Sequence, residues 1–167
     1  METSGNWAGN YIYKARQIFQ PKSIEQLQDL VSHNGKIRAL GTRHSFNDIA
    51  DSPGDLLSLK HFDNILRLDQ ERKTVTVEAG VRYGELCRWL DQEGFALHNL
   101  ASLPHISIAG ACATGTHGSG NSLGNLATIV SALELMTADG ELHNFSRQKN
   151  DDIFDGIVVS LGALGIV

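Results

Sequence analysis

The sequence predicts an α+β fold built around one hydrophobic core. Some segments repeat apolar residues at helical spacing, whereas others are short or alternating apolar runs, which indicates both helices and strands. These segments follow one another in a mixed order that includes hairpins, which favours the α+β class. With 167 residues, of which 41% are hydrophobic, the chain corresponds to one domain or to two small lobes that share a core.

The first half of the chain is expected to contain one helix and several strands. Apolar residues recur at helical spacing from Ile24 to about His33, and Ser23 and Gln26 form a capping-box pattern just before them. The helix should end at Asn34-Gly35. Short apolar runs predict strands at residues 37–40, 55–59, 65–68 and 73–79, the last with alternating apolar and polar residues.

The second half is expected to begin with a helix from Tyr83 to Glu93, with Gly94 as its C′ residue. Residues 98–125 have little periodicity and many Gly, Ser, Thr and His residues, so we expect a long functional connection there. Its small apolar residues favour an ordered, buried path. A hairpin of residues 129–137 and 141–145 is expected around Asp139-Gly140, and a last helix over residues 151–161.

Composition and charge argue against several classes of function. No stretch approaches the roughly 18 apolar residues of a membrane span, and the N-terminus lacks the apolar run of a signal peptide, so a cytoplasmic protein is expected. The net charge of −5, without a long basic cluster, argues against nucleic-acid binding. Cys87 and Cys112 are too few and too far apart for a disulfide framework, so both should be reduced. His98, His105 and His117 lack the spacing of a zinc site, so no metal is expected.

A glycine-rich segment, Gly110 to Gly120, is the first candidate site. Its backbone N–H groups have little side-chain bulk around them, which suits a pyrophosphate and suggests a dinucleotide cofactor. We expect Gly115 in particular to let the main chain approach the ligand. The pattern is neither a P-loop nor a G-x-G-x-x-G fingerprint, so a loop that only packs closely is an equally good interpretation. Hydroxyl donors nearby are Ser107, Thr114, Thr116 and Ser119.

His44 is the second candidate, because it follows a buried strand and lies beside Arg43. A lone histidine is more often a structural hydrogen-bonding residue than a chemical one. The neighbouring arginine is expected to lower the pKa of His44, because like charges disfavour the imidazolium. A neutral imidazole is the nucleophilic form.

Three motifs together resemble one family. They are GTRHSFN at residues 41–47, VEAGVRYGEL at 77–86 and ASLPHISIAGACATGTHGSG at 101–120. They are similar to FAD-linked alditol oxidases of the xylitol oxidase kind, related to sugar-1,4-lactone oxidases within the vanillyl-alcohol-oxidase type of flavoprotein. The resemblance runs from Asn6-Trp7-Ala8-Gly9-Asn10 to residue 165.

The resemblance implies a PCMH-type FAD-binding domain over residues 11–167, with one α+β lobe at about 11–80 and a second at about 81–167. It implies that His44 is linked covalently to the 8α carbon of the flavin, and that Ser102 also faces the substrate. Many relatives carry glycine directly before the linked histidine, where this chain has Arg43. The cofactor-binding positions that the resemblance implies are Leu40, Gly41, Thr42, Arg43, His44, Ser45, Ser102, Ser107, Gly110, Ala111, Cys112, Ala113 and Val167.

The implied activity is oxidation of a CH–OH group of a polyol such as xylitol or sorbitol, with oxygen as acceptor and hydrogen peroxide as product. The catalytic residues are expected in a covering substrate domain beyond Val167, and the apolar end of the sequence predicts such a continuation. Two alternatives stay open: a sugar-1,4-lactone oxidase or dehydrogenase, and a flavin-binding module without catalysis. Without the covering domain, self-association through the flavin face is expected.

Overall fold

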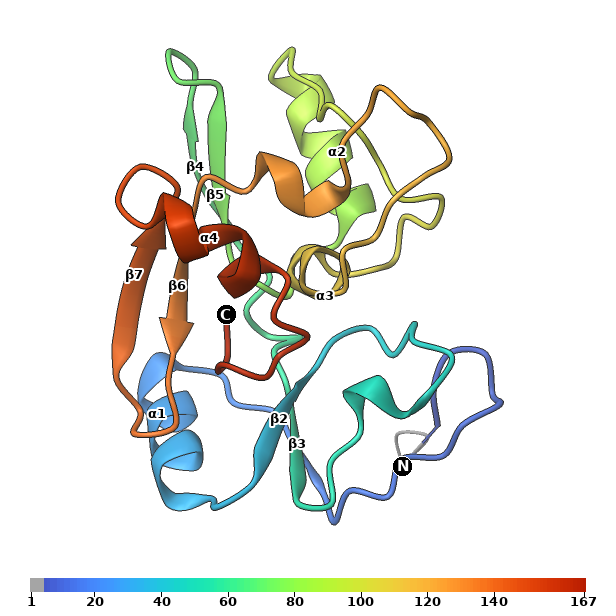
Figure 1. Cartoon of the computed structure of the whole chain (residues 1–167), viewed down its shortest axis with the longest axis vertical. Coiled ribbons are helices and arrows are strands. Elements are labelled where there is room, and N and C mark those ends of the chain that lie inside the picture. The colour runs from blue at the N-terminus through green and yellow to red at the C-terminus, as the bar shows by residue number, and fades with distance from the viewer. Residues whose placement is uncertain (1–4) are drawn as a thin grey trace.

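The computed structural model describes residues 5–167 as three small sheets and four α-helices (Figure 1). One sheet is parallel, in the order β1-β3-β2, with β1 at Ile18–Phe19, β2 at Ile37–Leu40 and β3 at Asp55–Ser58. Two antiparallel hairpins pair β4 (Ile65–Asp69) with β5 (Thr74–Val77) and β6 (Ala132–Met136) with β7 (Leu142–Ser146). The helices are α1 (Ile24–His33), α2 (Tyr83–Gln92), α3 (Ile108–Ala113) and α4 (Asp151–Val158). This mixed architecture is the α+β fold that the sequence predicts.

Helix α1 begins and ends where its sequence predicts. The Ser23 hydroxyl accepts a hydrogen bond from the Gln26 N–H, and the Gln26 side chain accepts one from the Lys22 N–H, so the cap satisfies one N–H of the first turn and one just before the helix. The buried face of α1 carries Leu27 and Val31, which pack in one cluster with residues of β3 and β6. Burial of this amphipathic face, rather than intrinsic propensity, stabilises a ten-residue helix.

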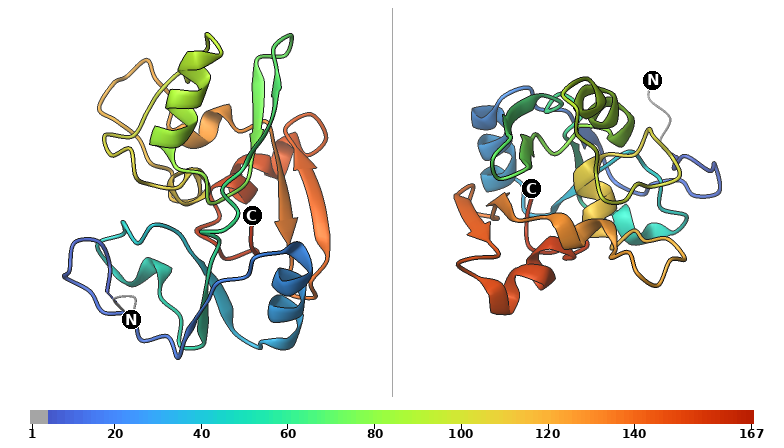
Figure 2. Two further views of the ribbon diagram at one scale, coloured as in Figure 1. Left: turned by 180° about the vertical axis from the view of Figure 1, so that it is seen from behind. Right: turned by 90° about the horizontal axis from the view of Figure 1, so that it is seen from above.

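The β6–β7 hairpin lies beside α1 in all views (Figures 1 and 2). The Gln28 side-chain amide donates to the Gly140 carbonyl at 3.1 Å, which joins the helix to the hairpin turn. Gly140 has a φ of +81°, a conformation that glycine adopts without steric cost, so the predicted Asp139-Gly140 turn is confirmed. Near the C-terminus, Ile166 forms a β-bridge with Met136 and is buried beside α1.

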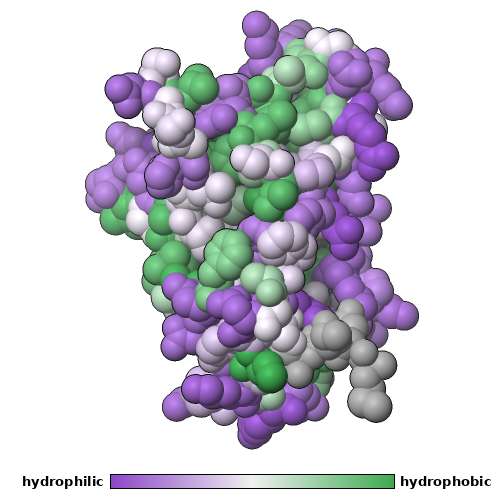
Figure 3. Space-filling model, turned by 90° about the vertical axis from the view of Figure 1, so that its right-hand side faces the viewer, coloured by the Kyte–Doolittle hydropathy of each residue, from purple (hydrophilic) through white to green (hydrophobic). Residues whose placement is uncertain are grey.

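The β4–β5 hairpin packs against α2. The half-buried Val75 and Val77 lie with Leu86 and Leu90 of the helix, whereas Thr74 and Thr76 are exposed, as the alternating sequence predicts. The hairpin and the helix thus pack together across the lobe boundary that the sequence predicts near residue 80. The division into two lobes stays a prediction. Apolar side chains gather in the upper middle of the face seen in Figure 3, and hydrophilic ones cover most of its right-hand margin.

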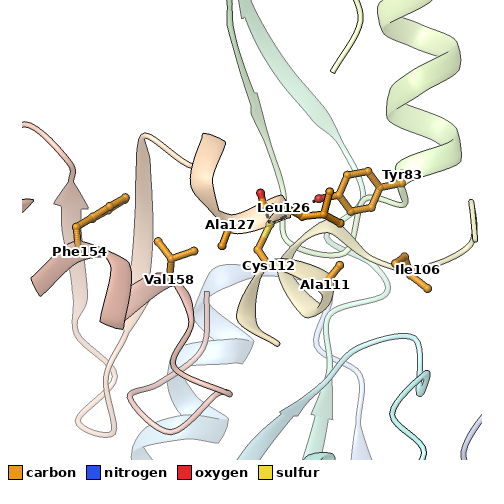
Figure 4. Packing of buried hydrophobic residues seen from close by; sticks show 8 residues of the cluster. All are labelled: Tyr83, Ile106, Ala111, Cys112, Leu126, Ala127, Phe154 and Val158. Carbon is orange, nitrogen blue, oxygen red and sulfur yellow. Dashed lines mark hydrogen bonds between the residues drawn. The ribbon is translucent and has the colours of Figure 1, made fainter. Parts of the chain in front are cut away.

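A third cluster joins α2, α3, the 3₁₀ turn Leu126–Ile129 and α4 (Figure 4). Phe154 and Leu126 are its most deeply buried members, and the Cys112 thiol lies 3.6 Å from the Tyr83 hydroxyl and 3.7 Å from the Leu126 carbonyl. Both cysteines are free thiols. No helix of residues 5–167 is long and apolar enough to cross a membrane.

The structure differs from the sequence prediction at four elements. Residues 98–125 contain α3, whose Gly and Ala residues lack the periodicity that announces a helix. The predicted strand at residue 129 begins at Ala132, because residues 126–129 form the 3₁₀ turn. Helix α4 ends at Val158, before the left-handed Leu161, whose φ is +54°. Strand β1, with two residues, was too short to give a sequence signal.

Candidate functional site

A cavity of about 640 Å³ brings the two candidate segments together. Cofactor sites commonly measure about 300–1,000 Å³, so the space suits a cofactor-sized ligand. We call residues 40–47, at the end of β2, the first wall, and residues 101–117, which include α3, the second wall. The predicted residues that line the cavity are Leu40, Gly41, Thr42, Arg43, His44, Ser45, Ser102, Ser107, Gly110, Ala111, Ala113 and Val167.

Cys112 is the predicted site residue that the cavity lining does not include. Its thiol lies instead in the core cluster, against Tyr83 and Leu126 (Figure 4). Burial raises the pKa of the thiol, so the group is an uncharged core residue. The predicted flavin contact of Cys112 stays a prediction, without support from the position of its side chain.

Gly115 lies in the turn that ends α3. It does not line the cavity, has a φ of +61°, and its N–H donates to the Cys112 carbonyl, which ends α3. The expectation that Gly115 lets the main chain approach a ligand stays a prediction, without support from its position outside the cavity lining. A turn that requires a left-handed residue explains this glycine.

Gly41 and Gly110 are the glycines at which the two walls meet. A Cβ on Gly41 would lie 3.1 Å from the Ser107 hydroxyl oxygen and 3.7 Å from the Gly110 Cα. A Cβ on Gly110 would lie only 2.9 Å from the same hydroxyl oxygen. Any side chain at these two positions would therefore fill the space between the walls. This cradle fits a ligand that needs close approach of the main chain.

The polar groups of the cavity suit an anion. The hydrogen bonds among residues 5–167 leave the N–H groups of Gly41, Thr42, Ser45 and Gly110 without a protein acceptor. The whole chain carries a net charge of −5, so local groups must attract the anion. The ionisable side chains on the lining, histidines apart, are Arg38, Arg43, Lys60 and Arg82 against Asp63 and Glu85.

His44 lies on the first wall within a cluster of rings. Its centroid is 4.6 Å from that of Trp7, 5.5 Å from Phe46 and 5.3 Å from His105. The rings of Trp7 and His105 are stacked at 5.6 Å. The Nδ1 of His44 and the Nε2 of His105 are buried without a hydrogen-bond partner in the described part of the chain.

The pKa of His44 is lowered, in the predicted direction but for a different reason. Removal of the imidazole from water is the main cause, and the proximity of His105 lowers the pKa further. The predicted cause, Arg43, is not among the groups that shift it. The neutral imidazole is thereby the favoured form at physiological pH.

Arg43 keeps the conformation that a glycine would adopt. Its φ is +62°, a left-handed conformation that costs a residue with a side chain about 1–2 kcal/mol. The Arg43 carbonyl accepts a hydrogen bond from the Trp7 N–H at 2.8 Å, which helps to hold this conformation. The backbone at Arg43 therefore has a conformation that a glycine at this position could also adopt.

Residues 6–10, which we call the strap, are the part of the site that the sequence interpretation missed. The resemblance begins at Asn6 to Asn10, and His105 lies in the motif at residues 101–120, but neither segment indicated a contact with His44. Among residues 5–167, no group of three or more His, Cys, Asp or Glu side chains could hold a metal ion. Three hydrogen bonds join the strap to the first wall: Trp7 N–H to Arg43 O at 2.8 Å, Asn6 Nδ2 to Ser45 O at 2.9 Å, and Asn10 Nδ2 to Phe46 O at 2.9 Å.

The chain is similar to known proteins over almost its whole length. The family model described as FAD binding domain matches residues 15–146. Alditol oxidase from Streptomyces sp. is 46% identical over 97% of this chain and 39% of its own length, and L-gulonolactone oxidase from Mus musculus is 36% identical over 97% and 38%. The solved structure of xylooligosaccharide oxidase from Myceliophthora thermophila C1 in complex with xylobiose matches with a TM-score of 0.79 at 21% identity, over 99% of this chain and 36% of that one. The chain thus spans well under half the length of these relatives.

Proposed function

Because this chain belongs to the FAD binding domain family, we propose that it holds FAD in an oxidase that acts on a CH–OH group of an alditol. The substrate would be of the xylitol or sorbitol type, with oxygen as acceptor, and the products an aldose and hydrogen peroxide. The 46% identity to an alditol oxidase supports this substrate class. Since the matched part is 39% of that relative, the proposal places the groups that act on the substrate hydroxyl in the remainder.

Covalent attachment of FAD through His44 is the second part of the proposal. The observation that carries it is the position of His44 on the cavity wall with its imidazole shielded and its pKa lowered, since the neutral ring is the nucleophile. In the overall change, one His44 N–H and one C–H at the 8α carbon are replaced by an N–C bond. The two hydrogens leave with two electrons to oxygen, which becomes hydrogen peroxide.

The remaining wall residues would bind and orient the cofactor. The N–H groups of Gly41, Thr42, Ser45 and Gly110 and the hydroxyl of Ser107 are the proposed donors to the pyrophosphate. FAD supplies the hydride acceptor when bound, and the protein supplies position and electrostatics. Ser102 is an exposed residue on the lining, which supports its proposed contact with the substrate.

The test of the attachment is flavin fluorescence on the protein band after denaturation in SDS. The unmodified chain should keep its fluorescence, and His44→Ala should lose it while retaining the fold by circular dichroism. His117→Ala is the matched control, because His117 is an exposed histidine on the same cavity lining and should keep covalent flavin. Fluorescence that persists in His44→Ala would reject His44 as the point of attachment, and loss in both variants would show that the loss in His44→Ala is not specific to that histidine.

A sugar-1,4-lactone oxidase is the second candidate, favoured by the 36% identity to L-gulonolactone oxidase. The two functions share the proposed cofactor site and differ in the substrate. The test is peroxide production with xylitol or sorbitol against L-gulono-1,4-lactone, measured on a chain that extends over the full length of the relatives. A higher kcat/KM for the lactone would replace the alditol in the proposal and leave the proposed FAD site unchanged.

A further inference from the structure

The strap is a closed loop tied to the main chain on both sides of His44. The Tyr11 N–H donates to the Asn6 side-chain oxygen at 3.1 Å, and the Asn6 amide donates to the Asn10 side-chain oxygen at 2.7 Å, so the strap is also held to itself. Its three bonds to the first wall end on the carbonyls of the residue before His44 and of the two residues after it. The backbone that carries the imidazole is therefore fixed from outside the sheet.

The strap also covers the ring. The ring centroid of Trp7 lies 4.6 Å from that of His44 and 5.6 Å from that of His105, so one indole contacts both imidazoles. Full protonation of an imidazole requires an N–H on each nitrogen, and the buried Nδ1 of His44 has no acceptor for a proton. The indole contact and the unpartnered Nδ1 favour the neutral form of the ring, which is the form that the proposed attachment needs.

We propose that the strap is a positioning element for His44, which fixes the loop around the imidazole and shields the ring from water through Trp7. The role of the strap in flavin attachment rests on the proposed function, but its effect on the pKa of His44 does not. Trp7 is a positioning residue that acts on His44. The strap precedes residues 15–146, so it lies outside the part that the family model matches.

Two neighbours of His44 have side chains that can carry a charge. From the second wall, His105 faces the imidazole and lowers its pKa. On its own loop, Arg43 precedes it, and the strap contributes no titratable side chain. A change of Trp7 therefore leaves the charges around His44 unaltered and changes its exposure to water.

The experiment is a titration of the histidine resonances of the flavin-free chain by NMR, with His44 assigned from the peak missing in His44→Ala. Trp7→Ala is expected to raise the pKa of His44 toward that of an exposed histidine, and Trp7→Phe to restore part of the shift. Trp7 is 56% exposed, so its truncation should leave the fold intact. Ile12→Ala is the matched control, since Ile12 is an apolar residue next to the strap that is 69% exposed, and should leave the pKa unchanged.

A second measurement follows covalent flavin formation on SDS gels against pH. Trp7→Ala should form the covalent product severalfold more slowly in mildly acidic buffer and recover the wild-type rate in alkaline buffer, where His44 is neutral in both proteins. Rescue by pH distinguishes shielding from a general loss of structure. Asn10→Ala, which removes the bond to the Phe46 carbonyl and the one that the Asn10 side-chain oxygen accepts from Asn6, but leaves Trp7 in place, should change both readouts in the same direction by less.

The inference and the attachment can fail separately. A pKa of His44 that is unchanged in both Trp7→Ala and Asn10→Ala would overturn the inference, whether or not flavin is attached. A lower pKa in Trp7→Ala would also overturn it, because the indole would then be stabilising the imidazolium. A raised pKa in a chain whose wild type never binds flavin covalently would support the strap and reject the attachment.

Discussion

The two walls of the cavity are held in place in different ways. The first wall, which carries His44, is tied at its surface by the strap, whose bonds involve partly buried or exposed groups. The second wall is rooted in the core, since Ala111 and Cys112 of α3 pack with Phe154 and Val158 of α4. Its main chain is thus positioned by burial, whereas the part of the first wall beyond the buried Leu40 is held to the strap by three hydrogen bonds.

The residue proposed to react and the core residues of α3 therefore lie on different walls. The side chain proposed to react lies on the wall that can be altered without opening the core. The main-chain donors of Gly110 lie on the wall that the core supports. Substitutions behind the second wall should therefore destabilise the protein, whereas substitutions of the residues around His44 should change its chemistry with little loss of stability.

The largest effect is expected for Phe154→Ala, behind the second wall. Phe154 is fully buried, so its truncation should cost about 3–5 kcal/mol of the free energy of unfolding, a large part of the about 5–15 kcal/mol of a typical domain. Urea denaturation measures this loss. The neighbouring Ile153 is 50% exposed, and Ile153→Ala should change the free energy by under about 1 kcal/mol. Equal losses in the two variants would contradict a core behind this wall.

A smaller effect is expected for Gly110→Ala, where the walls meet. The added methyl would lie 2.9 Å from the Ser107 hydroxyl oxygen and narrow the space beside Gly41, so FAD affinity should fall about tenfold, or roughly 1.4 kcal/mol. Alanine also favours a helix over glycine by up to about 1 kcal/mol, which offsets strain in the folded chain. Fluorescence titration with FAD measures the affinity.

The control for Gly110→Ala is Gly156→Ala in α4. Gly156 is also a helical glycine, and a Cβ there would meet no atom within 4 Å. Both variants gain helix propensity, but only the first puts a methyl between the walls. Equal affinities for FAD would show that the approach of Gly41 to Gly110 has no part in binding.

The parts of the fold that depend on neighbours in sequence could be predicted from the sequence. Helix α1, helix α2 with Gly94 after it, and the Asp139-Gly140 turn follow from spacing, capping and turn residues. Helix α3 could not be predicted in this way, because it is stabilised by burial of small residues and has no wide apolar face.

The candidate site shows the same division. The resemblance placed twelve of its thirteen cofactor residues on the wall of one cavity, because a shared motif carries its geometry with it. The surroundings of His44 depend instead on three segments far apart in the chain. No local pattern indicates that Trp7 and His105 would meet it, or that burial rather than Arg43 would lower its pKa.

The smallest effect is expected for Tyr11→Phe, which removes a hydrogen bond between the residue after the strap and Asp51. The Tyr11 hydroxyl donates to Asp51 at 2.7 Å, and this bond is the main cause that raises the pKa of Tyr11 from 10.0 to about 12. A folded-state pKa above that of the unfolded chain means that the stabilisation is complete below pH 10 and is lost as the pH rises toward 12. Tyr11→Phe should lower stability at neutral pH by less than Phe154→Ala does, and the gap to wild type should close in this alkaline window. Urea denaturation of both proteins across the window measures the gap, and Tyr13 and Tyr83 cancel because both proteins contain them. A gap that stays constant there would mean that the surface tie at Asp51 contributes nothing to holding this side of the cavity.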